Sequence, residues 1–282
     1  MARKLNGEII SCDSMQVYKN LPTLTAQPPK SILKLVRHHL ISILPLSAEY
    51  SAAKFIRQAK KKIKEIFDKG KIPIIVGGSG FYASALLDGL FQGPGEDSNL
   101  RRKLEKEATE FGNDYLYQRL QKLDPQTANE IHPHNLRRLV RAIEVCIKTG
   151  KKFSQVKRNR CGLWDNYDVK LIGLSRNRQE LYQRIDKRVE QMFKKDVIKE
   201  VKSALNLPLS KTARQIIGIN EIADYLEGRY NKEEARRLIE RNSRHFAKRQ
   251  LTWFKRDKRI DWIEIKELDR PEQIVQRIIK VI

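Results

Sequence analysis

Residues 7–18 read Gly-Glu-Ile-Ile-Ser-Cys-Asp-Ser-Met-Gln-Val-Tyr and join a short apolar run to a cluster of polar side chains. The apolar start favours a buried strand, and the small residues that follow favour a tight turn. This turn carries a carboxylate, a hydroxyl and an amide, in Asp13, Ser14 and Gln16. Open α/β sheets hold their chemistry at the carboxyl ends of their strands. The stretch therefore predicts an α/β sheet with a site at the end of this strand. Asp13 is a candidate general base or metal ligand, and a helix-capping role is the alternative.

A second strand-to-turn unit lies at residues 72–80. Its apolar run, Ile-Pro-Ile-Ile-Val, is typical of a strand in a buried parallel sheet, and a helix is expected over residues 81–90. The turn between them is Gly77, Gly78, Ser79 and Gly80. Backbone amides and a hydroxyl at a helix N-terminus can hold a phosphate group. Close packing of the strand against the helix is the alternative reason for these glycines.

The rest of the chain predicts an α/β core interrupted by helices. Further strands are expected over 39–44, 169–174 and 261–265. Helices are expected over 51–69, 99–111, 115–123, 125–131 and 135–149, and the stretch 178–256 is helical and charged. Strand patterns are absent between about residues 93 and 166. We therefore expect a core formed by residues 1–93 and 167–282, with a helical insertion domain over residues 94–166.

The charge balance indicates a polyanionic partner. The chain has 57 Lys and Arg against 34 Asp and Glu, which gives a formal net charge of +23. Within residues 137–141, Arg138 and Arg141 are three positions apart and share a helix face. Residues 241–258 mix basic side chains with aromatic ones, which suits an RNA with unstacked bases. The alternatives are solvated lysine-rich helices and a core role for Trp253 and Phe254 in an amphipathic helix.

Other features narrow the class of protein. The three cysteines show no metal-ligand spacing, which favours a reducing compartment. No cysteine or carboxylate completes a metal site around the histidine pairs at 38–39 and 132/134. Apolar runs stay well below the roughly 18 residues that a membrane span needs. We expect a cytoplasmic monomer that makes no membrane contact.

Several motifs together resemble one family. They are residues 9–18, Thr-Ala-Gln-Pro at 25–28, His-His-Leu-Ile at 38–41, Tyr-Ser-Ala-Ala at 50–53 and Val-Gly-Gly-Ser-Gly-Phe-Tyr at 76–82, with later matches at 135–145, 181–192, 217–218 and 247–253. This set is similar to the tRNA dimethylallyltransferases, also called tRNA isopentenyltransferases or IPP transferases. The resemblance implies a P-loop-NTPase-like parallel sheet. It also implies transfer of a dimethylallyl group from dimethylallyl diphosphate to N6 of the adenosine 3′ of the anticodon in tRNA.

The resemblance also implies roles for particular residues. Asp13 matches the general base, and Ser79 matches a family threonine near the diphosphate. The implied contacts to the tRNA anticodon stem-loop are Asp13, Ser14, Met15, Gln16, Arg101, Arg137, Arg138, Leu139, Val140, Arg141, Arg244, Lys248, Arg249 and Gln250. The implied diphosphate contacts are Gly77, Gly78, Ser79 and Gly80, with either Arg214 or Gln215. Departure of diphosphate calls for Mg²⁺ as cofactor.

One family element is missing from this sequence. Members begin with a strand and a P-loop, whereas no G-x-x-x-x-G-K-[ST] pattern occurs in these 282 residues. We therefore expect a truncated form that lacks the first strand, the P-loop and its metal ligand, and that transfers prenyl groups poorly. The alternative is a non-catalytic remnant that binds the anticodon loop. A nucleotide-kinase-like phosphotransferase is disfavoured because there is no Walker lysine.

Overall fold

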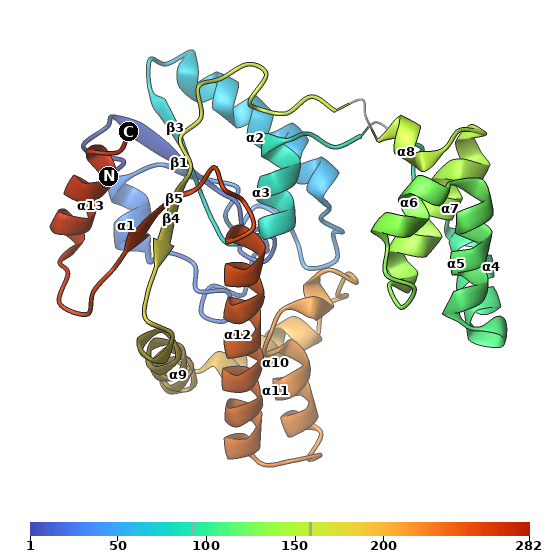
Figure 1. Cartoon of the computed structure of the whole chain (residues 1–282). Helices are drawn as coiled ribbons and strands as arrows, with labels where there is room; N and C mark the ends of the chain where they lie inside the picture. Colours follow the sequence, from blue (N-terminus) through green and yellow to red (C-terminus); the bar gives the residue numbers. More distant parts are fainter. Residues whose placement is uncertain (92, 158–159) are drawn as a thin grey trace. The chain divides into compact units, whose positions relative to one another are not determined.

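The structure is a computed structural model that describes residues 1–91, 93–157 and 160–282. These residues form two compact units (Figure 1). Unit 1 comprises Met1–Leu86 and Asp168–Ile282, and unit 2 comprises Leu87–Tyr167. Arg158 and Asn159, which belong to the predicted insertion 94–166, lie outside the described residues.

Unit 1 is built on a three-stranded parallel sheet. The central strand is β1 (Gly7–Ser11), with β2 (His38–His39) on one side and β3 (Ile72–Val76) on the other. Helix α2 (Ala52–Phe67) packs on β1 and β3, as the apolar spacing of its sequence predicts. Ser51 caps this helix by accepting a hydrogen bond from the Lys54 amide at 3.3 Å. The parallel pairing and the covering helix confirm the predicted α/β class.

The strand expected over residues 39–44 ends after His39. Leu40 and Ser42 have φ values of 63° and 52°, and such left-handed backbone cannot continue a strand. The segment instead turns toward the chain that follows β1. The Ser42 amide donates to the Gln16 carbonyl at 2.9 Å, and the Ile43 amide donates to the Val17 carbonyl at 2.8 Å. These long-range bonds decided the conformation, and the local apolar run did not.

A second parallel sheet in unit 1 pairs β4 (Ile172–Ser175) with β5 (Asp261–Glu264). The predicted strands at 169–174 and 261–265 therefore exist, with β4 shifted by three residues at its start. Helices α1 (Lys30–Leu35) and α13 (Pro271–Ile279) have no counterpart in the sequence prediction. Both are short, six and nine residues, which gives the apolar pattern few turns in which to repeat.

The charged stretch 178–256 resolves into several helices. They are α9 (Arg178–Lys194), α10 (Val197–Leu205), the 3₁₀ helix η1 (Ala213–Gln215), α11 (Ile219–Leu226) and α12 (Lys232–Phe254). Helix α12 packs against α9 and α11 through a narrow face that buries Ala235, Ile239 and Ser243 (Figure 1). Most of its remaining surface stays in solvent and carries the basic side chains.

Helix α3 (Gly80–Leu87) begins directly at the glycine turn, and its Tyr82 packs on α2. The rings of Tyr82 and Phe55 stack with centroids 5.2 Å apart. The Tyr82 hydroxyl donates to the Tyr50 carbonyl at 3.1 Å. These contacts fix the start of α3, and with it the turn, against the buried part of unit 1.

Unit 2 is helical in the residues that the structure describes. Its helices are α4 (Ser98–Phe111), α5 (Asn113–Leu123), α6 (Pro125–Glu130), α7 (Leu136–Thr149) and the short α8 (Phe153–Val156), which the sequence did not predict. Its core contains Leu104, Leu116, Leu120 and Leu139 at zero exposure. Asp124 is fully buried and accepts hydrogen bonds from Thr127 and Ser154. Burial raises the pKa of Asp124, but these hydrogen bonds outweigh it and lower the pKa below its ordinary range.

Candidate functional site

The turn after β1 is held by Asp13. One carboxylate oxygen, Oδ1, accepts the Met15 amide at 2.8 Å and the Gln16 amide at 3.3 Å. This is the capping geometry that the sequence left open as the alternative role of Asp13. The second oxygen, Oδ2, has no hydrogen-bond partner among the described residues. A single side chain can therefore shape the turn with one oxygen and present the other to a ligand.

The glycine turn after β3 contacts the Asp13 turn directly. Ser79 accepts a hydrogen bond from the Ser14 amide at 3.0 Å, and its own hydroxyl donates to Ser14 Oγ at 3.3 Å. A methyl group at Gly77 would lie 2.1 Å from the Cys12 carbonyl oxygen, so only glycine allows this approach. Parallel pairing of β1 with β3 places both strand ends at one sheet edge. The predicted catalytic pair thus shares one site.

The C-terminal half of helix α12 contacts the same glycine turn. Gln250 donates to the Gly78 carbonyl at 2.9 Å, and a methyl group at Gly78 would lie 2.0 Å from Gln250 Nε2. The Trp253 ring would lie 2.4 Å from a methyl group at Gly80. Trp253 also donates its indole N–H to Ser84 Oγ at 3.1 Å. The glycines therefore serve close packing as well as any ligand, and Trp253 is partly a packing residue.

The charges around Asp13 include a residue to which the sequence assigned no role. Arg188, on α9, keeps an exposed surface, yet protein around its guanidinium lowers its pKa, and the charge of Asp13 opposes this effect. The same charge acts on Cys12, whose pKa burial and Asp13 together raise to about 12. Cys12 is therefore a neutral thiol, which excludes it as a nucleophile at neutral pH. Arg188 lies within the segment 181–192 that resembles the family. The sequence could not single it out, because several other charged residues stand beside it in this segment.

The side chain of Gln16 is committed to the structure of the turn. It accepts from Ser11 Oγ at 3.1 Å and donates to the carbonyls of Thr25 and Ala26 at 3.3 Å and 3.1 Å. Gln27 donates to the Gln16 carbonyl at 3.1 Å. Gln16 was predicted to contact tRNA, and the structure shows it bracing the loop that follows the Asp13 turn.

The C-terminal half of α12 forms a basic surface with a cavity of about 480 Å³. Lys248, Arg249 and Trp253 are among the residues that line it. The Arg249 guanidinium lies over the Phe246 ring, 5.8 Å from its centroid. Arg244 is less available, because it forms an ion pair with Asp186 at 2.5 Å. The predicted tRNA-contacting residues of this helix are thus divided between an open surface and a helix-to-helix contact.

In unit 2, two predicted RNA contacts are engaged in a buried ion-pair cluster. Arg101 and Arg141 bind Glu144, whose side chain is fully buried, at 2.9 Å and 2.6 Å. Burial raises the pKa of Glu144, but the hydrogen bonds from Arg101, the Asp97 amide and Arg141 outweigh it and lower the pKa. Arg141 also donates to the Pro94 carbonyl at 3.0 Å. These two guanidiniums therefore link α4, α7 and the chain before α4 within unit 2.

The segment 137–141 alternates between core and solvent. Leu139 is fully buried and Val140 is 3% exposed, so their side chains pack in the core of unit 2, and the predicted contact of these two residues with tRNA stays a prediction that their side chains do not support. Arg137 and Arg138 are exposed. Helical geometry separates these roles, because neighbouring residues point in different directions around the axis. Arg137 and Arg138 are therefore the side chains of this segment that can reach a ligand.

The sequence left open whether Arg214 or Gln215 contacts diphosphate, and both are exposed on η1. In the part of the chain that the structure describes, neither side chain forms a hydrogen bond or ion pair. The preceding segment is anchored, because Glu49 accepts from the Lys211 amide and from Thr212 Oγ1, each at 2.7 Å. The backbone of η1 is thus fixed while both side chains extend into solvent.

Metal-ligating side chains do not cluster in the described residues, where no group of three or more His, Cys, Asp or Glu could hold a metal ion. Near the glycine turn the hard oxygen donors are Asp13 Oδ2 and the hydroxyls of Ser14 and Ser79. Mg²⁺ in phosphate sites commonly takes one or two protein oxygens and completes its shell with phosphate and water. These oxygen atoms are ligands of the kind that Mg²⁺ takes in a phosphate site. They are too few to surround the ion without phosphate and water.

Across the described residues, no helix has both the length and the apolar character needed to cross a bilayer.

Comparisons with known proteins agree with this geometry. Residues 16–257 match the model of the IPP transferase family. The chain is 44% identical to the tRNA dimethylallyltransferase of Halothermothrix orenii, over 95% of this chain and 83% of the relative. It is 45% identical to that of Carboxydothermus hydrogenoformans, over 99% and 90%.

Solved structures give the same answer. A tRNA isopentenylpyrophosphate transferase from Bacillus halodurans superposes with a TM-score of 0.69 and 36% identity, covering 98% of this chain and 87% of that one. A eukaryotic dimethylallyltransferase acting on tRNA superposes with a TM-score of 0.79 and 28% identity, covering 99% and 72%. The glycine turn, the Asp13 turn and the helices around them are therefore those of a known fold, and the chain belongs to the IPP transferase family.

Proposed function

We propose that this chain transfers a dimethylallyl group from dimethylallyl diphosphate to N6 of the adenosine 3′ of the anticodon in tRNA, at a low rate because these 282 residues contain no P-loop pattern. The observation that carries the proposal is the contact between two turns. Ser79 of the glycine turn bonds to Ser14 of the Asp13 turn at 3.0 Å, which brings a phosphate-binding backbone next to a free carboxylate oxygen. The family membership supports the same reaction class.

Asp13 acts on the nucleophile. The N6 nitrogen attacks the allylic carbon, the new N–C bond forms, and the C–O bond to diphosphate breaks. Asp13 Oδ2 accepts the N6 proton as positive charge builds on nitrogen. Oδ1 meanwhile keeps the Met15 and Gln16 amides, so the carboxylate is held in place during the step. An adenine inside a stacked loop cannot reach this position, so the base is flipped out of the stack.

The glycine turn acts on the leaving group. Diphosphate gains negative charge as it departs, and the amides of Gly77, Gly78 and Gly80 together with the Arg188 guanidinium stabilise that charge, while the Ser79 amide bonds to the Cys12 carbonyl. The Ser79 hydroxyl exchanges its long 3.3 Å bond to Ser14 for a phosphate oxygen. Mg²⁺, when bound, supplies further charge neutralisation on the diphosphate. The hydroxyls of Ser14 and Ser79 are the oxygens that would hold it, since Asp13 Oδ2 is the base in this proposal.

Exposed basic groups on both units bind the tRNA. On α12 these are Lys248 and Arg249, beside the aromatic surface of Phe246 and Trp253. On unit 2 they are Arg137 and Arg138, which makes the helical unit a tRNA-contacting domain. Phosphate contacts of this kind position the RNA without reading its sequence. The protein works as a monomer in the cytoplasm, where its tRNA substrate is found.

The test measures binding and transfer separately. The chain is mixed with tRNA and isotopically labelled dimethylallyl diphosphate, and label at N6 is quantified by nuclease digestion and mass spectrometry. Single-turnover transfer that is lost in Asp13→Ala supports the proposal. Tight tRNA binding without transfer would favour the non-catalytic alternative, and absence of both would overturn the proposal.

A further inference from the structure

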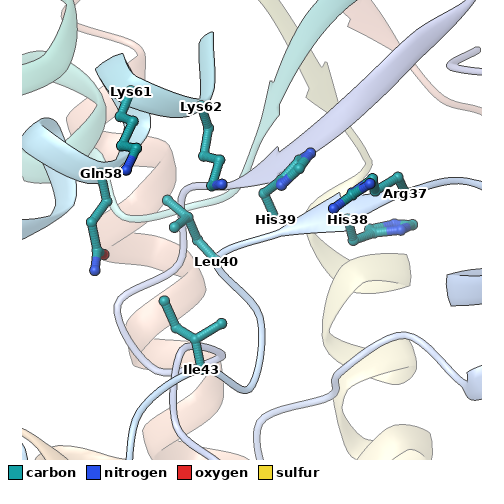
Figure 2. A pocket seen from close by; sticks show the side chains of 8 residues that line it. All are labelled: Arg37, His38, His39, Leu40, Ile43, Gln58, Lys61 and Lys62. Atoms are coloured by element: carbon teal, nitrogen blue, oxygen red, sulfur yellow. The ribbon is translucent and has the colours of Figure 1, made fainter. Parts of the chain in front are cut away.

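A second cavity in unit 1 lies apart from the residues of the proposed reaction. It has a volume of about 410 Å³ and is formed by helix α2 and the segment that includes β2 (Figure 2). Gln58, Lys61 and Lys62 reach into it from α2, while Arg37 and His38 come from the β2 side. None of these side chains has a role in the prenyl transfer described above.

The charge of this cavity is unbalanced. Two side chains that line the cavity form ion pairs: Lys62 with Glu65 at 2.7 Å, and His39 with the buried Glu8. Among the described residues, no other ion pair involves the lining. Arg37 and Lys61 therefore add two positive charges to the lining without an ion pair of their own, although the charge of Lys61 also acts on Glu65. A lining with an excess of positive charge attracts anions.

The floor of the cavity is fixed by long-range contacts. Leu40, at a left-handed φ of 63°, lines it and is 5% exposed. A bulky residue in this conformation is held by its surroundings, here by the bonds that tie Ser42 and Ile43 to the chain after the Asp13 turn. Behind the floor, His39 Nε2 lies 2.7 Å from the buried carboxylate of Glu8. The backbone floor of the hollow is thus preformed, while its walls include the exposed side chains of Arg37, Ile43 and Lys61.

We propose that this cavity is a binding site for a phosphate group, with Arg37 and Lys61 as its principal ligands. Arg37 and Lys61 lie toward opposite ends of the lining, with Lys62 and His39 between them (Figure 2). A guanidinium and an ammonium on one lining suit a phosphate ester, because Arg supplies paired donors and Lys a point charge. Gln58 supplies an uncharged amide donor, and Leu40 and Ile43 supply apolar surface on which the remainder of a phosphate ester can rest. The phosphate comes either from a small free molecule or from the RNA backbone.

The free-phosphate source is tested without RNA. Protein labelled with ¹⁵N is titrated with pyrophosphate, and the imidazole and amide signals of His38 and Lys61 are followed by NMR. We expect saturable shifts of these signals in the wild type. In Arg37→Gln and in Lys61→Gln, the affinity for pyrophosphate derived from these shifts should be at least tenfold weaker. Lys64→Gln is the matched control, because Lys64 is an exposed lysine of the same helix and does not line the cavity. Pyrophosphate at the glycine turn does not interfere, because the signals report this cavity alone.

The RNA source is tested by tRNA affinity as a function of salt. If the cavity holds a backbone phosphate, Arg37→Gln and Lys61→Gln each lower the slope of log K against log salt by about 1, and Lys64→Gln leaves it unchanged. Only this arm rests on the proposed function. Wild-type tRNA binding reports whether that function holds, so the two failures are distinguishable. The proposal is overturned if pyrophosphate moves none of the cavity signals and all three variants bind tRNA like the wild type.

Discussion

At the scale of single residues, Asp13 does two jobs that a substitution can separate. Its Oδ1 holds the turn through the Met15 and Gln16 amides, and its Oδ2 is the proposed base. Sequence spacing alone allowed either role. The structure shows that the capping role is real and that it leaves one oxygen for chemistry.

Asp13→Asn keeps an oxygen that accepts the two amides but removes the base. We expect the single-turnover transfer rate to fall by about 10²–10⁴-fold, with the melting temperature and tRNA affinity retained. Asp13→Ala loses the rate and also the cap, which costs about 1 kcal/mol of stability. A rapid-quench assay and a thermal melt on both variants check this. Unchanged transfer in Asp13→Asn would assign the residue to the turn alone.

Glu8 is a buried carboxylate in β1 with two partners, His39 at 2.7 Å and Lys71 at 2.9 Å. Burial raises the pKa of Glu8, but hydrogen bonds from Lys71 and His39 outweigh it and lower the pKa to about 2, from an ordinary 4.5. A carboxyl whose pKa is lowered on folding adds stability above its unfolded pKa, and that stability disappears as pH falls from about 4.5 toward 2.

Glu8→Gln should therefore cost about 2–3 kcal/mol of unfolding free energy at pH 7 and progressively less below pH 4.5. Urea unfolding at a series of pH values measures the difference. Glu65→Gln is the control, because its pair with Lys62 lies at the surface, where solvent screens it, and a much smaller loss is expected there. A Glu8→Gln effect that is independent of pH would contradict the assignment.

At the scale of elements, the glycine turn between β3 and α3 is the junction of the site. Three contacts meet there, from the Cys12 backbone, from Ser14 and from Gln250 of α12. Cys12 and Ser14 belong to the turn after β1 and Gln250 to a helix far along the chain, so the glycine turn is held by tertiary packing and not by its own sequence. Its glycines are needed because the neighbours approach so closely.

Gly77→Ala places a methyl group 2.1 Å from the Cys12 carbonyl oxygen, which is backbone and cannot move aside. We expect a loss of about 1–3 kcal/mol of stability and a transfer rate that falls with it, because the two turns separate. Chemical unfolding and single-turnover assays test the change. Gly95→Ala is the control, since nothing lies within 4 Å of its added methyl group, and wild-type behaviour is expected there.

At the scale of the whole molecule, the net charge of +23 comes from basic side chains of two kinds, those that form ion pairs within the protein and those that are exposed. Arg101 and Arg141 form ion pairs with the buried Glu144, while Arg137 and Arg138 are exposed on the same helical unit. Composition indicates a polyanionic partner but cannot say which cations are free to bind it.

Arg138→Ala should weaken binding of every tRNA tested and lower the salt slope by about 1, with the melting temperature unchanged. Arg141→Ala should instead lower stability by about 1–3 kcal/mol, because it removes a hydrogen-bonded partner from a buried carboxylate. Filter binding across salt concentrations and calorimetry separate the two outcomes. An Arg138→Ala variant with the wild-type salt slope would remove this residue from the RNA surface.

The sequence predicted the α/β class, because the apolar runs at 7–11 and 72–76 and the periodic helix after residue 51 are strong local signals. It missed α1 and α13, which are too short for their pattern to repeat, and it extended β2 past His39. Within the candidate site, Asp13, Ser79 and Gln250 were singled out from their motifs, and the structure places them on contacting segments, while their roles stay predictions. Arg188 was not singled out, because nothing in the sequence of a charged helix indicates which arginine feels the charge of a carboxylate 175 positions earlier in the chain.

The sequence by itself determined the strand-and-turn units, the basic character and the family resemblance, since these depend on residue type and spacing along the chain. Tertiary structure decided which oxygen of Asp13 is free, that Gln250 and Trp253 pack on the glycine turn, and that Leu139 and Val140 face a core. It also created the cavity between α2 and the β2 segment. The physical reason is that these outcomes depend on contacts between segments far apart in sequence, which only the folded chain brings within hydrogen-bonding and van der Waals distance.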